Sequence, residues 1–168
     1  DGAATAGNDY TATNGTLTWS AGESGAKSMD VLMAQDALDE SNETVVVTLS
    51  GTNNTVVSGT NITTVTITDD DAFSTIRFSA SSSSGSETGT TVSVGLNLSD
   101  VAGRAVSVQY GVSGGTATGG GTDYTLAAGT ATISAGSTAT VISVSVNNDA
   151  LDEANETVIL SLSNVVDG

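Results

Sequence analysis

The sequence contains no cysteine, no histidine and no proline among its 168 residues. The first two absences exclude disulfide bonds, zinc fingers, thiol nucleophiles and histidine-based acid–base catalysis. Aromatic residues make up only 4% of the chain, and three basic residues, Lys27, Arg77 and Arg104, stand against 19 acidic ones, for a formal net charge of −16. A chain of this charge repels phosphate backbones and anionic membrane surfaces, so we expect no nucleic-acid partner and no direct membrane insertion. Cations are the partners that the charge favours.

Long apolar runs are also missing. No apolar stretch approaches the roughly 20 residues that span a bilayer. The sequence also shows no basic segment followed by an apolar core, the pattern of a signal peptide. The apolar residues instead alternate with small polar ones, as Val92, Val94, Leu96 and Leu98 do. This period of two is typical of strands with one buried face. Strands are predicted at 15–20, 28–34, 43–50, 63–68, 75–79, 90–98, 105–112, 129–134, 139–147 and 156–163.

Two blocks of the sequence occur twice. GNDYTATNGTLTWSAGE at 7–23 returns as GTDYTLAAGTATISAGS at 121–137, and DALDESNETVVVTLS at 36–50 returns as DALDEANETVILSLS at 149–163. The copies lie 114 residues apart in the first block and 113 in the second. Because solenoid units run roughly 20 to 45 residues and domains roughly 100 to 150, the repeat is a domain. We predict an all-β fold of tandem antiparallel, immunoglobulin-like β-sandwiches, with both chain ends falling inside a domain.

Acidic residues dominate the repeated segments. Four carboxylates fall within the eight residues 36–43, between two predicted strands, and Asp69, Asp70 and Asp71 follow another strand directly. Crowded like charges disfavour the compact state unless a counter-ion neutralises them, and we expect no lysine or arginine close enough to do so. Calcium, which takes six to eight oxygen ligands, is the natural counter-ion. The spacing is not that of an EF-hand, so the ligands of such a site must converge from separate loops.

The order of these motifs resembles the Calx-beta family, the calcium-binding sandwich of sodium/calcium exchangers, integrin β4 and many large bacterial surface proteins. The motifs are G-x-DY, then GT-x-T-x-x-x-GE, then D-x-x-x-E-x-x-E-T-x-x-x-x-LS, then T-V-T-I-x-DDD. The resemblance implies that residues 1–71 are the C-terminal half of one such domain, and that residues 72–168 are a second domain lacking its last strand.

The resemblance also implies a set of calcium ligands. In the family these come from an early glutamate, the aspartate of the DY loop, the acidic loop before a late strand, and a terminal run of aspartates. The matching positions are Asp9, Asp36, Glu40, Glu43, Asp69, Asp70 and Asp71 in the first domain, and Glu87, Asp123, Asp149, Glu153 and Glu156 in the second. Gln35 and Asn148 stand where some members carry a further aspartate. The first domain shows no early glutamate and the second no terminal aspartate run, so neither ligand set is complete.

The function that these features predict is structural rather than enzymatic. We expect a calcium-binding repeat module of a large extracellular or cell-surface protein, an adhesin or filament from a bacterium, in which calcium rigidifies the junction between domains. Its partners would be calcium ions and neighbouring repeats of the same chain or other copies in a filament. The alternatives are a regulatory calcium sensor, a glycosidase using paired carboxylates, and an ice- or glycan-binding face formed by Thr64, Thr66 and Thr68.

Three aromatic residues are expected to be structural. Trp19 follows Leu17 by two positions on one strand face, which predicts a core position for its indole. Tyr10 and Tyr124 each follow a candidate ligand aspartate, and we expect them to pack rather than to bind.

Overall fold

The computed structural model describes residues 2–51 and 56–167, and strands are the regular elements of those residues. None of the described residues forms a helix long and apolar enough to cross a membrane. Residues 2–51 and 56–167 form strands rather than helices where they are regular, because the two-residue apolar period places side chains on alternate faces of an extended chain. The prediction of an all-β fold is confirmed.

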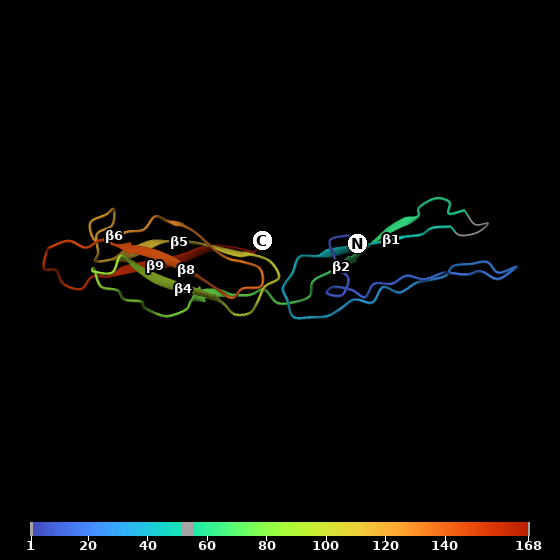
Figure 1. Ribbon diagram of the computed structural model, residues 1–168, viewed down its shortest axis with the longest axis horizontal. Coiled ribbons are helices and arrows are strands. Elements are labelled where there is room, and N and C mark those ends of the chain that lie inside the picture. Colours follow the sequence, from blue (N-terminus) through green and yellow to red (C-terminus); the bar gives the residue numbers. More distant parts are fainter. Residues whose placement is uncertain (1, 52–55, 168) are drawn as a thin grey trace. The chain divides into compact units, whose positions relative to one another are not determined.

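The chain divides into two compact units. The first comprises Asp1–Ala37 with Ser41–Asp71, and the second comprises Leu38–Glu40 with Ala72–Gly168. Figure 1 shows the strands of each unit.

The second unit is a sandwich of two antiparallel sheets (Figure 1). In the four-stranded sheet the strands lie in the order β3-β4-β8-β6, and in the three-stranded sheet in the order β7-β5-β9. The bounds are β3 Ile76–Phe78, β4 Thr91–Leu98, β5 Val106–Gly115, β6 Tyr124–Thr125, β7 Gly129–Ile133, β8 Ala139–Val146 and β9 Val158–Asp167. All pairings in both sheets are antiparallel, as the short alternating strands predicted.

The core of this unit lies between the two sheets. Leu96 of β4 and Ile142 of β8 meet Val108 of β5 and Ala131 of β7, and all four are buried. A second group of buried side chains continues the core, namely Leu98, Ala102, Val106 and Ile133. The inward residues are the apolar members of each alternating strand, so the periodicity of the sequence decides which face is buried.

Among its described residues, the first unit has one ladder, in which β1 (Glu43–Thr48) pairs antiparallel with β2 (Ile62–Ile67). Its buried cluster is small and contains Ala4, Tyr10 and Val45, with partly buried side chains from β2 packed against it. Tyr10 and its counterpart Tyr124 are both buried, which confirms that these two rings pack.

Two predicted strands of the first unit, 15–20 and 28–34, are not strands in the structure. Their sequence counterparts in the second unit are β7, which pairs with β5, and β8, which pairs with β4. Among the described residues, the first unit has no strand that corresponds to β4 or β5, so 15–20 has no ladder to join. The segment 28–34 keeps a single antiparallel bridge, between Tyr10 and Met33. The prediction that Trp19 lies in the core is wrong for the same reason, since 45% of its surface is exposed.

Candidate metal centre

The aspartate of each DY loop accepts a hydrogen bond from the backbone amide of a preceding threonine in both repeats. Asp9 accepts a hydrogen bond from the Thr5 amide through Oδ2 at 2.5 Å, and Asp123 accepts one from the Thr118 amide at the same distance. The glycine two positions before each aspartate has positive φ, 96° at Gly7 and 102° at Gly121. A left-handed residue favours glycine, so the G-x-DY motif encodes a turn that holds the carboxylate in place.

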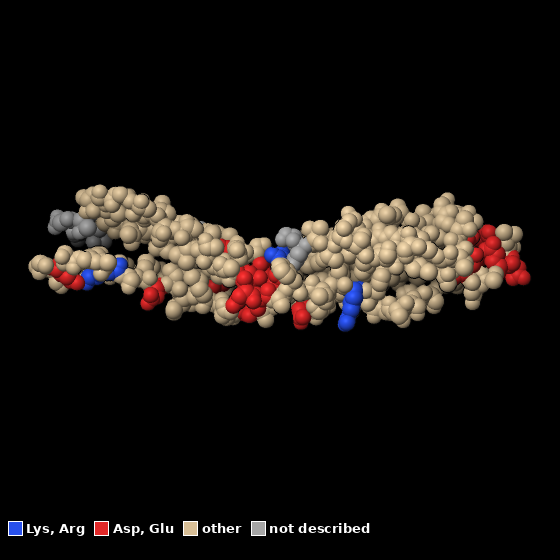
Figure 2. Space-filling view, turned by 180° about the vertical axis from the view of Figure 1, so that it is seen from behind, with Lys and Arg blue, Asp and Glu red and all other residues tan. Residues whose placement is uncertain are grey.

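In the second unit, three predicted ligands come together from two separate loops. Asp123, Glu153 and Glu156 each offer a carboxylate oxygen, and these oxygens all lie within 4.8 Å of one another. Asp123 precedes β6 directly, while the two glutamates belong to the acidic loop before β9. Figure 2 shows acidic side chains gathered at one end of this unit. The group therefore depends on the fold, as the non-EF-hand spacing predicted.

The electrostatics of this group disfavour the charged carboxylates. The pKa of Glu153 is raised by desolvation and then by the negative charges of Asp149, Asp123 and Glu87. The pKa of Glu156 is raised by desolvation, then by its hydrogen bond with Asp123 and by the surrounding carboxylates. Mutual repulsion of this kind is relieved by a proton or by a cation.

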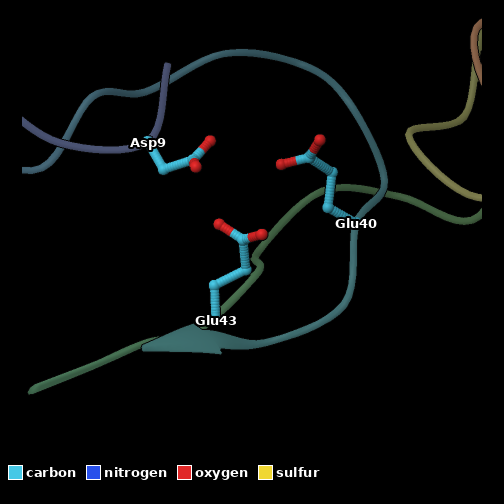
Figure 3. A group of neighbouring side chains, drawn as sticks. All are labelled: Asp9, Glu40 and Glu43. Carbon is cyan, nitrogen blue, oxygen red and sulfur yellow. The ribbon is translucent and has the colours of Figure 1, made fainter. Parts of the chain in front are cut away.

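In the first group, Asp9, Glu40 and Glu43 offer carboxylate oxygens that also lie within 4.8 Å of one another. Figure 3 shows the three carboxylates pointing toward one another. The members match the second group residue for residue in the repeat, since Asp9, Glu40 and Glu43 are the counterparts of Asp123, Glu153 and Glu156. The same pattern of residues thus produces the same grouping twice.

The aspartate run lies among other acidic groups of the first unit. The pKa of Asp71 is raised by desolvation and then by the charges of Asp69, Asp70 and Asp36. Gln35 donates a hydrogen bond to Asp70 at 3.3 Å. The neutral residue that stands where some family members carry an aspartate is therefore beside this run, with its amide oxygen available as a ligand.

The twelve predicted ligands thus divide into those that lie close to other carboxylates in a group and those that do not. Six form the two close groups, and the other six, Asp36, Asp69, Asp70, Asp71, Glu87 and Asp149, lie outside them. Asp36, Asp69 and Asp70 act electrostatically on Asp71, while Glu87 and Asp149 act on Glu153. All twelve residues therefore remain candidate calcium ligands, seven in the first repeat and five in the second.

One ion pair of the acidic loop was not predicted from the sequence. Asp39 is only 1% exposed and forms an ion pair with Arg104 at 2.7 Å, whereas no basic partner was expected for this loop. Arg104 also donates a hydrogen bond to the backbone carbonyl of Glu40 at 3.2 Å. The two charged residues are 65 positions apart, and a partner at that separation leaves no periodic signal in the sequence.

The donor chemistry fits a hard divalent cation. Each close group contributes only carboxylate oxygens, and neither contains nitrogen or sulfur ligands. Oxygen ligands of this kind suit calcium and magnesium, and an irregular set on loops suits the flexible coordination of calcium better than the octahedral coordination of magnesium.

The fold and the two groups define a β-sandwich protein with acidic cation-binding loops. A model of the Calx-beta domain matches the sequence at residues 1–71 and again at 69–168. The chain belongs to the Calx-beta domain family, whose members bind Ca²⁺, and the resemblance seen in the sequence is confirmed.

Among solved structures, one match is the crystal structure of CBD12 from CALX1.2, at 22% sequence identity and a TM-score of 0.48. The match covers 98% of this chain and 64% of that one, so this chain spans less than two thirds of its length. No curated protein sequence matches this chain significantly.

Proposed function

We propose that this protein is a non-enzymatic, calcium-binding structural module, in which the ion completes the acidic loops of each repeat and stiffens the chain at the boundary between repeats. The observation that carries the proposal is the group of Asp123, Glu153 and Glu156, whose carboxylate oxygens converge from two loops. Glu153 and Glu156 have raised pKa values, so a bound cation would remove a repulsion that is already present.

The position of the acidic residues along the chain supports a role at the boundary. Asp69, Asp70 and Asp71 are the last residues of the first unit, and Ala72 begins the main part of the second. A cation held by such a run would restrict the backbone dihedrals there, because its ligands lie on consecutive residues. Near-identical acidic loops in successive repeats suit a permanently occupied site rather than a single regulatory switch.

The proposed location is the cell surface or the extracellular space of a bacterium, in an adhesin, matrix protein or filament. Millimolar extracellular calcium would keep sites of moderate affinity occupied, since extracellular modules bind with dissociation constants of roughly 10⁻⁴ to 10⁻³ M. A composition rich in serine, threonine and glycine accords with that setting. Neighbouring repeats are the proposed macromolecular partners.

Calorimetric titration of the chain with calcium tests the proposal. We expect saturable binding that the double variant Glu153→Gln with Glu156→Gln weakens at least ~10-fold, because it removes two ligand charges from one group. A matched control is Asp100→Asn with Asp152→Asn, which removes two negative charges from exposed residues outside both groups. Equal binding by all three proteins would show that calcium does not use this group.

Small-angle scattering at both ends of the titration tests the stiffening. We expect the distribution of particle dimensions to narrow when calcium is added, and the narrowing to be lost in Asp70→Asn with Asp71→Asn. If the scattering of the calcium-saturated protein equals that of the calcium-free protein, calcium does not stiffen the chain. If the titration gives a dissociation constant in the micromolar range or below, a calcium sensor is favoured.

A further inference from the structure

The loop that carries Asp123 differs from the loop that carries Asp9 in length and in glycine content. It reads TGGGTD at 118–123, whereas its counterpart reads TAGND at 5–9. In both loops the aspartate accepts a hydrogen bond from the amide of the first threonine, so the second loop closes the turn with one more residue and two more glycines. Because glycine loses more backbone freedom on folding than any other residue, the longer loop is the costlier of the two to order.

Asn147 contacts the longer loop at two points. Its backbone amide donates a hydrogen bond to the carbonyl of Asp123 at 2.9 Å, and its side-chain amide donates one to the carbonyl of Gly121. A Cβ atom placed on Gly121 would lie 3.6 Å from the side-chain nitrogen of Asn147, so this side chain packs directly against the glycine run. Asn147 is half-buried and follows β8 directly, and it therefore ties the loop to the end of a sandwich strand.

The first repeat has only one of these two contacts at the same position. The counterpart of Asn147 is Ala34, whose backbone amide donates a hydrogen bond to the carbonyl of Asp9, also at 2.9 Å. The side chain of Ala34 is a methyl group, so it cannot donate a hydrogen bond to the loop. The repeats thus share the backbone contact, and the side-chain contact occurs in the repeat whose loop is longer and richer in glycine.

The carbonyl of Gly121 lies at a point of the loop that controls where Asp123 is held. The amide of Gly121 donates a hydrogen bond to the carbonyl of Tyr124 at 3.1 Å, and the amide of Asp123 donates one to the carbonyl of Thr118 at 3.0 Å. The side chain of Asn147 adds a third restraint between these two. Since the carboxylate of Asp123 is the member of its group that comes from this loop, order in the loop sets where that ligand lies.

We propose that Asn147 is a positioning residue of the group formed by Asp123, Glu153 and Glu156. It acts through the carbonyl of Gly121, and it holds the carboxylate of Asp123 near the two glutamates before an ion arrives. The inference rests on the calcium binding proposed above. A ligand that is already in place costs less conformational entropy when the ion binds, so the calcium affinity of this group depends on Asn147.

The dependence on the loop gives the proposal a sharp test. Calcium titrations are made on the full 168-residue protein carrying Glu40→Gln with Glu43→Gln, so that binding by the first group is weakened. We expect Asn147→Ala to weaken the remaining binding by about 3- to 10-fold, the value of one ordinary hydrogen bond. When residues 118–123 are replaced by the shorter sequence of residues 5–9, we expect the same substitution to change the affinity less than ~2-fold, because the glycine run is gone.

A matched control removes an amide elsewhere in the same sheet. Asn97 is half-buried in β4 and pairs with Ala139, at the end of β8 opposite to Asn147. We expect Asn97→Ala to leave the calcium affinity unchanged. An equal loss of affinity in Asn97→Ala and Asn147→Ala would mean that the affinity follows the general stability of the sheet and not the position of Asp123.

Amide exchange in the calcium-free protein measures the order of the loop without any metal. We expect the amides of Gly121 and Asp123 to exchange at least ~5-fold faster in Asn147→Ala, because the loop then opens locally more often. Exchange in β5 and β9 is expected to stay unchanged, which separates a local effect from a loss of overall stability.

Two further results would overturn the proposal. One is unchanged exchange at Gly121 and Asp123 in Asn147→Ala. The other is an equal loss of calcium affinity in the natural loop and in the shortened loop, since Asn147 would then not act through the glycine run. If no variant and no unchanged protein binds calcium, the proposed function is wrong, and the exchange comparison alone decides whether Asn147 holds Asp123 in place.

Discussion

At the scale of single residues, two kinds of acidic side chain differ in how their charge is balanced. Those of the first kind gather with one another, as Asp123, Glu153 and Glu156 do, with raised pKa values at the two glutamates. Asp39 differs, because it is buried and pairs with Arg104. Repulsion in the first kind favours a cation, whereas the second kind is already neutralised within the protein.

Arg104→Ala is predicted to destabilise the second unit by about 3–5 kcal/mol, because it leaves the charge of Asp39 buried without its arginine. The loss in the free energy of unfolding is measured by calorimetric unfolding and by amide exchange in β4 and β8. Arg77→Ala removes the same charge from an exposed residue of β3 and is expected to cost less than ~0.5 kcal/mol. Equal effects of the two substitutions would mean that the loss of net positive charge, not the ion pair, sets the stability.

The calcium-free protein is predicted to become more stable as the pH falls from 7 toward the ordinary carboxyl pKa of 4.5. Glu153 and Glu156 have raised pKa values in the folded protein, so the folded state binds protons more readily than the unfolded state. Their contribution to stability is fully present below the unfolded pKa and is lost as pH rises through the folded pKa. The melting temperature of the calcium-free protein, measured at several pH values, tests this prediction.

In saturating calcium we expect the opposite trend, because protons then compete with the ion for the same oxygens. The variant Glu153→Gln with Glu156→Gln should show a smaller pH effect without calcium. A melting temperature that falls steadily on acidification in the calcium-free protein would contradict this prediction.

At the scale of elements, the two units use similar sequences but differ in which strands form. The segments 129–133 and 139–146 are strands because β5 and β4 pair with them. Their counterparts in the first unit have the same alternation of apolar residues but no partner strand among the described residues. Strand formation is therefore a property of the pair, since a lone extended segment leaves its backbone groups to water.

The stability of the two units is predicted to respond very differently to the same truncation. Ile142→Ala removes a fully packed side chain of β8 and is expected to cost about 2–5 kcal/mol. Met29→Ala, at the counterpart position, is expected to cost less than ~1 kcal/mol, because the side chain is 39% exposed and its loss leaves no enclosed cavity. Calorimetric unfolding of both variants measures the two costs, and a large loss at Met29 would show that this residue is packed in solution.

At the scale of the whole molecule, net charge is the dominant property. A formal charge of −16 is carried on 168 residues with only three basic side chains, and Figure 2 shows the acidic residues concentrated in patches. Self-repulsion of this size works against compact folding and is screened by salt, with a Debye length of about 10 Å at 0.1 M. A bound divalent ion acts on the patches directly.

Calcium at about 1 mM is therefore predicted to raise the melting temperature more than sodium chloride of equal ionic strength, because binding to the folded state adds stability as the free ion exceeds its dissociation constant. In the Glu153→Gln with Glu156→Gln variant, we expect the advantage of calcium over sodium chloride to shrink. If calcium and sodium chloride act equally on the unchanged protein, its acidic loops are only screened and not occupied.

The sequence by itself determined the class of fold, the repeat and the acidic motifs from which the two carboxylate groups are drawn, while the structure decided which six of the twelve candidates lie close together. Alternation with period two dictates which side chains can share a face, and the duplicated G-x-DY and acidic-loop motifs act locally, through a left-handed glycine and a short loop before a strand. Only the tertiary structure decided whether 15–20 and 28–34 become strands, where Trp19 lies, and that Arg104 reaches Asp39. These outcomes depend on partners distant in the sequence, and neither periodicity nor local motif specifies whether such a partner is present.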